Sequence, residues 1–177
     1  QDQDITHSLP HHEYYQNDIY QLNDFYPYLR YQILTSSTDT LRNYHMIDEG
    51  LENALKKYIV DSYDMESLIQ CLLSKRYTRP RIQRMIIHIL MKNTKKEIQD
   101  AMNIDYLRIL AMNNKGRAYL NKIKKVCSYK IVTNYTSYSH PALDIELKAT
   151  KVLSLISSHP QNIIKKEYSS IPYIKED

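Results

Sequence analysis

The chain has 177 residues, of which 42% are hydrophobic, 25% are charged and only two are glycine. This length predicts one globular domain with a core of its own. Glycine-rich phosphate loops need several glycines, because backbone has to approach the phosphate closely, so Gly50 and Gly116 alone exclude P-loop and dinucleotide-binding folds. No apolar run approaches the ~20 residues of a membrane span, and no signal peptide is visible.

The two cysteines, Cys71 and Cys127, lie in apolar runs without a CxxC motif or a nearby histidine at metal-binding spacing. This pattern predicts a reduced, cytoplasmic protein without a metal site. The chain begins with glutamine rather than methionine, which indicates a piece of a longer protein.

The charge is unevenly distributed along the chain. Residues 75–130 carry 15 Lys and Arg against 3 acidic residues, a net charge of +12, whereas the other 121 residues carry 9 against 17, a net charge of −8. Such asymmetry is typical of a polyanion-binding face, so nucleic acid is the predicted partner. The alternative is that the lysine-rich helices are simply solvated faces.

Residues 1–20 are polar and lack a sustained period, so they predict a linker or an arm before a domain over 21–160. The polar segment 161–177 is expected to be a tail that is strapped to the body or frayed. The arm contains His7, His11 and His12, which lack a carboxylate or cysteine at suitable spacing, so no metal site is predicted there.

Helices are predicted over 25–34, from Ser37, from Glu49 and over 64–73. From Glu49 onward, apolar side chains recur at helical spacing up to Ile59, which leaves Glu52 on the outward face. Glu49 and Glu52 lie in the first turn of this helix, where carboxylates stabilise the positive end of its dipole.

The segment 75–84 is strongly basic, with four arginines, one lysine and no acidic residue. Thr78 and Pro80 predict the start of a helix, and the apolar stripe from Ile82 to Leu90 is expected to face the core. Arginine suits phosphate contacts and stacking on bases, and the exposed N–H groups of a helix start also attract phosphate. RNA binding is therefore predicted for Lys75, Arg76, Tyr77, Arg79, Arg81 and Arg84.

Beyond this segment, a capping box at Thr94 predicts a short helix. The next elements are predicted to form a parallel crossover, with a strand over 106–111, a helix over 116–126 and a strand over 129–133. A well-buried helix over 141–156 is expected to close the core. Four outward cations of the middle helix are predicted to extend the RNA-binding track: Lys115, Arg117, Lys122 and Lys125. The predicted fold class is mainly α (α+β), a helical domain with a small two-strand parallel βαβ element.

Three segments carry a resemblance to a known family: Glu49-Gly50-Leu51-Glu52-Asn53, the basic run from Lys75 to Arg84, and Tyr106-Leu107-Arg108-Ile109-Leu110. Over about residues 24–156 the chain resembles the C-terminal part of bacterial tRNA(Met) cytidine acetate ligases. In one position the chain departs from that pattern, because Ala111 stands where the family tends to have a glycine, which puts a close RNA approach there in doubt.

The resemblance implies a function. In that family an N-terminal nucleotidyltransferase-like domain with a HxGH-type motif binds ATP, with magnesium, and forms acetyl-adenylate. The acetyl group then passes to N4 of the wobble cytidine of elongator tRNA(Met). No histidine of this sequence precedes a Gly-His pair. The implied function is a tRNA-binding C-terminal domain without catalytic residues or cofactor, whose partners are elongator tRNA(Met) and the missing N-terminal domain.

Two other functions stay open at this point. The basic face could dock a non-catalytic interaction or dimerisation module on an acidic protein, because arginines paired with carboxylates give the same charge pattern. A stand-alone enzyme would use Glu49, Glu52 and His88 as acid and base groups, but their positions point to different helix faces.

Overall fold

The structure is a computed structural model that describes residues 19–175. His7, His11 and His12, and with them most of the predicted arm, therefore lie outside the described residues. The described helices, beginning with a short 3₁₀ helix η3, are η3 (Leu22–Phe25), α1 (Tyr26–Thr35), α2 (Thr38–Asn43), α3 (Leu51–Asp61), α4 (Met65–Leu72), α5 (Arg79–Leu90), α6 (Lys95–Ala101), α7 (Asn114–Ile123), η4 (Tyr135–Ser137), α8 (Pro141–Ser154) and α9 (Pro160–Ser169). The described strands are β1 (Tyr106–Arg108), β2 (Ala111–Asn113), β3 (Lys130–Val132) and β4 (Tyr173–Lys175).

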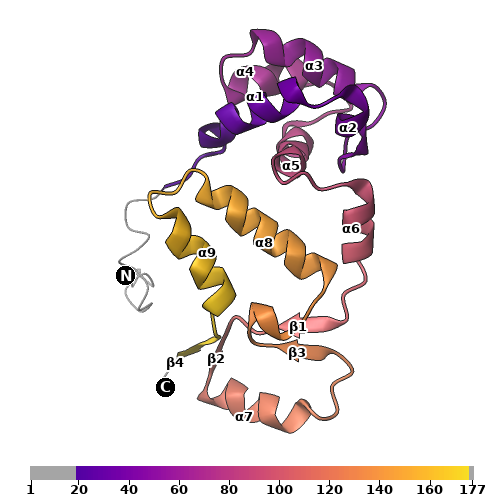
Figure 1. Cartoon of the computed structure of the whole chain (residues 1–177). Helices are drawn as coiled ribbons and strands as arrows, with labels where there is room; N and C mark the ends of the chain where they lie inside the picture. Colours follow the sequence, from indigo (N-terminus) through magenta and orange to yellow (C-terminus); the bar gives the residue numbers. More distant parts are fainter. Residues whose placement is uncertain (1–18, 176–177) are drawn as a thin grey trace, which may run out of the picture.

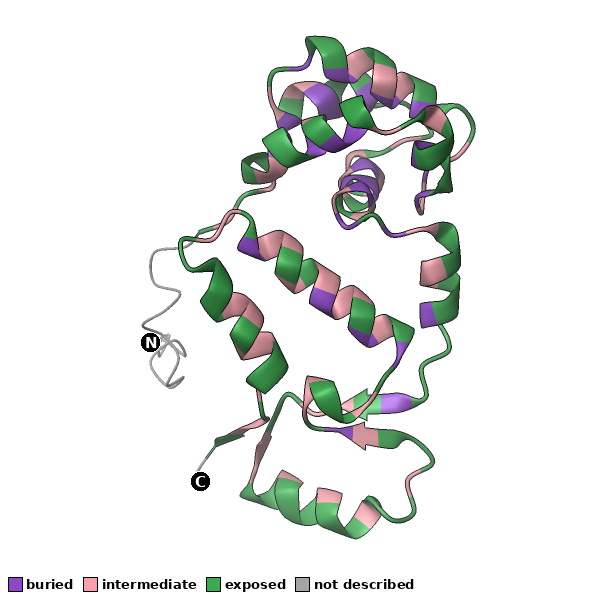
Figure 2. Cartoon of the chain, viewed as in Figure 1, coloured by how far each residue is buried: buried purple, intermediate pink, exposed green. Residues whose placement is uncertain are grey.

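Helices α1 to α5 form one packed group at one end of the molecule, and α6 leads from it toward the strands (Figure 1). Their apolar stripes meet in a shared core, as the 3.6-residue period of α3 and α5 predicts. Most of the fully buried side chains belong to this core, among them Leu29, Ile33, Leu55, Ile59, Leu68, Ile82, Ile86 and Ile89. Figure 2 shows the same concentration of buried residues in this group.

Local signals fix where several of these helices begin. Thr94 and Glu97 form the predicted capping box of α6, with each side chain bonded to the other residue's backbone N–H. Gly50 precedes α3 with φ of +85°, a conformation in the left-handed region that costs glycine little.

The strands form two separate parallel pairs rather than one. β1 pairs with β3 in the register Tyr106 to Lys130, and β2 pairs with β4 in the register Ala111 to Tyr173. The single strand predicted over 106–111 is therefore wrong. The pairing partner changes between Ile109 and Leu110. The Ile109 N–H donates to the carbonyl of Val132 (2.9 Å), whereas the carbonyl of Leu110 accepts from Tyr173 (3.0 Å).

The predicted mainly helical fold with a small parallel-strand element is confirmed in outline. Helix α7 lies between β2 and β3, as the crossover predicts, and begins two residues earlier than expected. The expectation that the helix over 141–156 is well buried is wrong, because Leu143 and Leu147 are the buried apolar residues of α8 while Ala149 and Leu155 are exposed.

Residues beyond 160 form helix α9 and strand β4, which hold this segment against the rest of the chain. α9 contacts α8, and β4 pairs with β2. The Arg108 side chain in β1 links the two helices, since it pairs with Glu146 of α8 and, at 2.7 Å, with Glu167 of α9. A second, much smaller core lies beside these elements and consists of Tyr106, Val132 and Leu143.

Candidate nucleic-acid interface

The basic segment predicted from the sequence forms a tight turn that leads into α5. The Ser74 N–H donates to the carbonyl of Tyr77 (3.2 Å), and the Tyr77 N–H donates to the hydroxyl of Ser74 (3.0 Å). These two bonds close the turn and leave Lys75 and Arg76 at its exposed tip. Thr78 is the N-cap of α5, and Pro80 lies in the first helical turn, as predicted.

Tyr77 anchors this segment to the larger core. Its ring is half-buried against the larger core, and its hydroxyl donates to the carbonyl of Asp48 (3.3 Å). The guanidinium of Arg81 lies over the ring at 4.9 Å from its centre, and that of Arg76 lies at 5.8 Å. Such cation–π contacts restrict the two arginines and leave their N–H groups available for hydrogen bonds.

Two of the four arginines are paired with carboxylates of the same chain. Arg79 donates two hydrogen bonds to Glu66 of α4, at 2.7 and 2.6 Å, and Arg76 pairs with Glu49. The hydrogen bond from Arg79, helped by one from Gln70, lowers the pKa of Glu66 to about 2. The positive charges of Arg76 and Arg79 are therefore compensated within the chain.

The other three cations of the segment have no carboxylate within ion-pair distance in the part of the chain that the structure describes. Lys75 and Arg84 are exposed, and Arg84 contacts only the carbonyl of Pro80 in its own helix (3.3 Å). Arg81 is held by Tyr77 instead of by an acid. We call Lys75, Arg81 and Arg84 the free cation group.

The second predicted part of the RNA track lies on or next to α7. This helix has no buried residue, and the side chain of Tyr119 on it is 63% exposed. All four predicted cations are exposed and lack an ion pair among residues 19–175: Lys115, Arg117, Lys122 and Lys125. The structure places α7 at the opposite end of the molecule from α5, so the two predicted parts do not form one local cluster (Figure 1).

The structure does not bring together the three candidate acid and base residues. Glu49 pairs with Arg76, and His88 packs edge-on against His45, with 4.6 Å between ring centres. Glu52, expected on the outward face of α3, is only 2% exposed and accepts two hydrogen bonds from Arg42, at 3.0 and 2.8 Å. This expectation fails because a charged partner on α2 compensates the carboxylate inside the fold.

Electrostatic interactions with Arg42 keep the buried carboxylate of Glu52 charged. Burial raises the pKa of Glu52, but the hydrogen bonds and the charge of Arg42 outweigh this effect and hold the pKa below its usual value. Glu52 is therefore a charged structural residue that joins α2 to α3.

The carboxylates that pair with the arginines were missed by the sequence analysis. Glu66 lies 13 residues before Arg79 and on a different helix. Spacing within one helix predicts partners only three or four residues apart, so no local pattern could have indicated this pair.

Two further properties concern the described residues as a whole. Between residues 19 and 175, no group of three or more His, Cys, Asp or Glu side chains could hold a metal ion. None of the helices described there combines the length and the apolar character that crossing a membrane requires.

Comparison with known proteins identifies a family and several relatives. The family described as HIGH Nucleotidyl Transferase matches residues 1–168. The tRNA(Met) cytidine acetate ligase of Bacillus licheniformis is 36% identical over 154 residues, which cover 84% of this chain and 37% of that protein. The enzyme of the same name from Anoxybacillus flavithermus is 35% identical over 185 residues, which cover 97% of this chain and 46% of that protein.

Solved structures share the fold. The apo crystal structure of Thermotoga maritima TmcAL superimposes with a TM-score of 0.76 at 21% identity and covers 88% of this chain and 41% of its own. A second crystal form of the same protein, bound with alpha-thio ATP, gives the same TM-score. The chain thus spans between about a third and a half of the length of the relatives described here.

These findings correct the function implied by the resemblance. The relatives are the expected ligases, but the prediction of a C-terminal tRNA-binding domain without the catalytic domain is wrong, because the nucleotidyltransferase family itself matches residues 1–168. The N-terminal nucleotidyltransferase-like domain therefore cannot be counted as a missing partner. One short HxGH-type motif does not decide membership of the family, because the family match extends over nearly the whole chain.

Proposed function

The chain belongs to the HIGH nucleotidyltransferase family, and from this membership we propose that it acts in the ATP-dependent ligation of acetate to a cytidine of tRNA(Met). The names of the relatives supply the reaction, and the free cation group supplies the physical support. In this proposal Lys75, Arg81 and Arg84 bind phosphates of the tRNA, with elongator tRNA(Met) as the preferred substrate in the cytoplasm.

One observation carries the proposal: among residues 19–175, three cations without carboxylate partners lie just before and in the first half of α5, beside an aromatic ring that fixes one of them. A surface arginine that pairs with an acid gains little from binding phosphate, because it exchanges one anion for another. An unpaired arginine gains a new charge-assisted hydrogen bond. Lys75, Arg81 and Arg84 therefore contribute more to RNA affinity than Arg76 and Arg79.

The α7 cations are a second phosphate-binding surface in this proposal. Lys115, Arg117, Lys122 and Lys125 are exposed on one short helix. Since α5 and α7 lie at opposite ends of the molecule, a tRNA that contacts both has to extend along it (Figure 1). A folded tRNA is a large polyanion, so contacts at two ends of one protein add to the same binding energy.

ATP belongs to the proposal as a substrate of the overall reaction, by analogy with the ligase structure bound with alpha-thio ATP. The described residues offer neither a glycine-rich phosphate loop nor a metal-binding cluster. Neither glycine meets the requirement of such a loop, since Gly50 is the N-cap of α3 and Gly116 lies within α7. No step of the chemistry is therefore assigned to them.

A binding titration tests the proposal. Wild-type chain is titrated with elongator tRNA(Met), initiator tRNA(Met) and an unrelated RNA duplex at two salt concentrations. The variant Arg81→Ala/Arg84→Ala is compared with Lys57→Ala/Lys165→Ala, which removes the same charge from exposed positions of α3 and α9. We expect the arginine variant to weaken tRNA binding at least tenfold and to reduce the salt slope by about 1.8, at about 0.9 per phosphate contact.

The outcomes separate the parts of the proposal. Preference for the elongator tRNA supports a recognition role, whereas equal binding of all three RNAs confines these residues to phosphate contacts. If the arginine variant binds tRNA as tightly as the lysine control, the assignment to α5 is wrong.

A further inference from the structure

A second polar site lies beyond the residues predicted from the sequence, in a cleft of about 830 Å³ between the end of α7 and β3. This volume falls within the roughly 300–1,000 Å³ of ordinary small-ligand sites. Hydroxyl, amide and ammonium groups line much of the cleft, together with two tyrosine side chains. Its position at the foot of the molecule is distinct from that of the free cation group on α5 (Figure 1).

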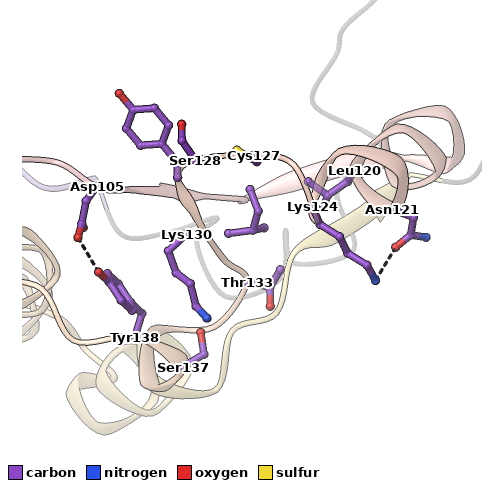
Figure 3. Close-up of a pocket in the computed structure, with 12 residues that line it drawn as sticks. Asp105, Leu120, Asn121, Lys124, Cys127, Ser128, Lys130, Thr133, Ser137 and Tyr138 are labelled. Atoms are coloured by element: carbon purple, nitrogen blue, oxygen red, sulfur yellow. Dashed lines mark hydrogen bonds between the residues drawn. The ribbon is translucent and has the colours of Figure 1, made fainter.

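Several donors face the interior of this cleft. Figure 3 shows Lys130 and Ser137 with their polar ends close together and Thr133 beside them, whereas Lys124 lies at the α7 edge with its ammonium group directed toward Asn121. Lys124 reaches only the amide oxygen of Asn121, at 3.4 Å, and neither lysine takes part in an ion pair among the described residues. One ammonium group and two hydroxyls thus offer hydrogen-bond donors to one space, and a second ammonium group lies at its α7 edge.

One acid, Asp105, belongs to the lining. The carboxylate of Asp105 accepts a hydrogen bond from the Tyr138 hydroxyl at 2.8 Å, and His140 lies 3.8 Å from its other oxygen. The lining therefore keeps a net positive charge, with the two lysines against Asp105. An oxygen-rich anion such as a phosphate group fits this set of donors.

An aromatic ring completes the site. Tyr129 lines the cleft and is 47% exposed, so its ring face is accessible to a planar group. Aromatic rings beside cations are the usual means of holding unpaired nucleotides, because each base stacks on the ring while its phosphate meets the cation.

We infer that this cleft binds an unpaired nucleotide of an RNA strand, with its phosphate at Lys130, Thr133 and Ser137, the next phosphate of the strand at Lys124, and its base against Tyr129. The inference rests on the proposed tRNA function and adds a single-stranded site to it. A strand is favoured over a free nucleotide because exposed cations continue beyond the cleft at Lys122 and Lys125, where neighbouring phosphates of the same strand lie within reach.

The test measures binding of a fluorescein-labelled eight-nucleotide oligocytidylate to the 177-residue chain. We expect Lys124→Ala/Lys130→Ala to weaken binding about tenfold and to lower the salt slope by about 1.4, at about 0.7 per phosphate of a single strand. Tyr129→Ala should weaken binding about tenfold, whereas Tyr129→Phe should bind as the wild type does, because the ring is retained. The control Lys57→Ala/Lys165→Ala should change the affinity less than twofold.

Three further arms separate the possible results. A blunt RNA duplex should not compete with the oligonucleotide at the cleft, and ATP should compete only weakly. Strong competition by ATP that is lost in Lys124→Ala/Lys130→Ala would replace the RNA strand by a free nucleotide and overturn the inference. Equal binding by this variant and the lysine control would overturn it as well.

The proposed function is tested separately by the same proteins. Arg81→Ala/Arg84→Ala should weaken binding of folded tRNA and leave the oligonucleotide affinity within twofold. If this variant binds tRNA normally while the cleft variants lose the oligonucleotide, the α5 assignment fails and the cleft stands. Circular dichroism of each variant checks that the fold is retained.

Discussion

At the scale of single residues, the basic turn before α5 contains two kinds of arginine. Arg76 and Arg79 are paired with Glu49 and Glu66, whereas Arg81 is fixed by the ring of Tyr77 and has no acid beside it among the described residues. In the proposed function the glutamates therefore compete with an RNA phosphate for the first kind of arginine and not for the second. A count of positive charges in the sequence treats all of them alike and overestimates the cationic surface.

This competition predicts opposite effects of neighbouring substitutions. Glu66→Gln should raise the affinity for tRNA about two- to threefold, because Arg79 is then released from a pair of modest energy. Arg81→Ala should lower the affinity about tenfold, since a charge-assisted phosphate contact is lost, and Arg79→Ala should lower it less. Fluorescence anisotropy at fixed salt measures all three. Equal losses for Arg79→Ala and Arg81→Ala would show that the ion pair with Glu66 does not protect its arginine from RNA.

His88 of α5 gives a second prediction at this scale. Burial, with a smaller effect of the neighbouring His45, lowers the pKa of His88 to about 4 from its usual 6.5. Between these values the unfolded chain binds more protons than the folded chain, so stability rises with pH. The free energy of unfolding should therefore fall by at most about 3 kcal/mol as the pH drops from 6.5 to 4.

Urea denaturation at several pH values measures this dependence. His88→Gln should remove most of it, because the amide does not titrate, whereas His159→Gln at an exposed position should leave it unchanged. A slope that persists in His88→Gln would assign the acid sensitivity to other groups.

At the scale of the elements, Arg108 joins β1 to both C-terminal helices. Its side chain is 17% exposed and pairs with Glu146 of α8 and Glu167 of α9. Arg108→Ala should lower the free energy of unfolding by about 2 kcal/mol, because two carboxylates lose their partner in a partly desolvated position. The exposed Arg117→Ala on α7 is the matched control and should change stability by less than about 0.5 kcal/mol. Urea unfolding measures both, and equal values would mean that the link adds nothing beyond a surface charge.

The elements that could be predicted from the sequence are those whose signals lie in neighbouring residues. Residues close together in the sequence determine the apolar period of α3 and α5 and the capping box of α6, and these elements were predicted within a few positions. The pairing of β2 with β4 joins residues about 60 positions apart and has no local signal. For the same reason the basic residues of the candidate interface could be predicted, but not their division into paired and free cations, which depends on Glu49 and Glu66.

The cleft beside β3 illustrates the same limit. Lys124, Lys130, Thr133 and Ser137 come from a helix end, a strand and the segment after it, and no motif spans them. Only the parallel pairing of β1 with β3 and the return of the chain through η4 bring these side chains together.

At the scale of the whole molecule, the two hydrophobic cores differ greatly in size. The larger core unites α1 to α5, whereas the smaller one contains three buried residues, Tyr106, Val132 and Leu143. Since burial of apolar surface is the main source of stability, the two ends of the molecule should differ in local stability.

Hydrogen exchange measures this difference. Amides of α1, α3 and α5 should exchange most slowly, and those of α7 and α9 should exchange earlier, because neither of these two helices has a buried residue. Leu55→Ala should cost about 3 kcal/mol of global stability and speed exchange throughout α1 to α5. Uniform protection across α7 and α5 would show that the chain opens as one cooperative unit.

The placement of α7 between two anchored strands also has an evolutionary consequence. The segment 114–129 leaves from β2, which is paired with β4, and returns in β3, which is paired with β1. Mutations on α7 therefore change a charged outer surface while both of its attachments stay fixed and the larger core is untouched. Selection can adjust the charge of this surface in small steps, without first acquiring compensating changes in the helices that keep the protein folded.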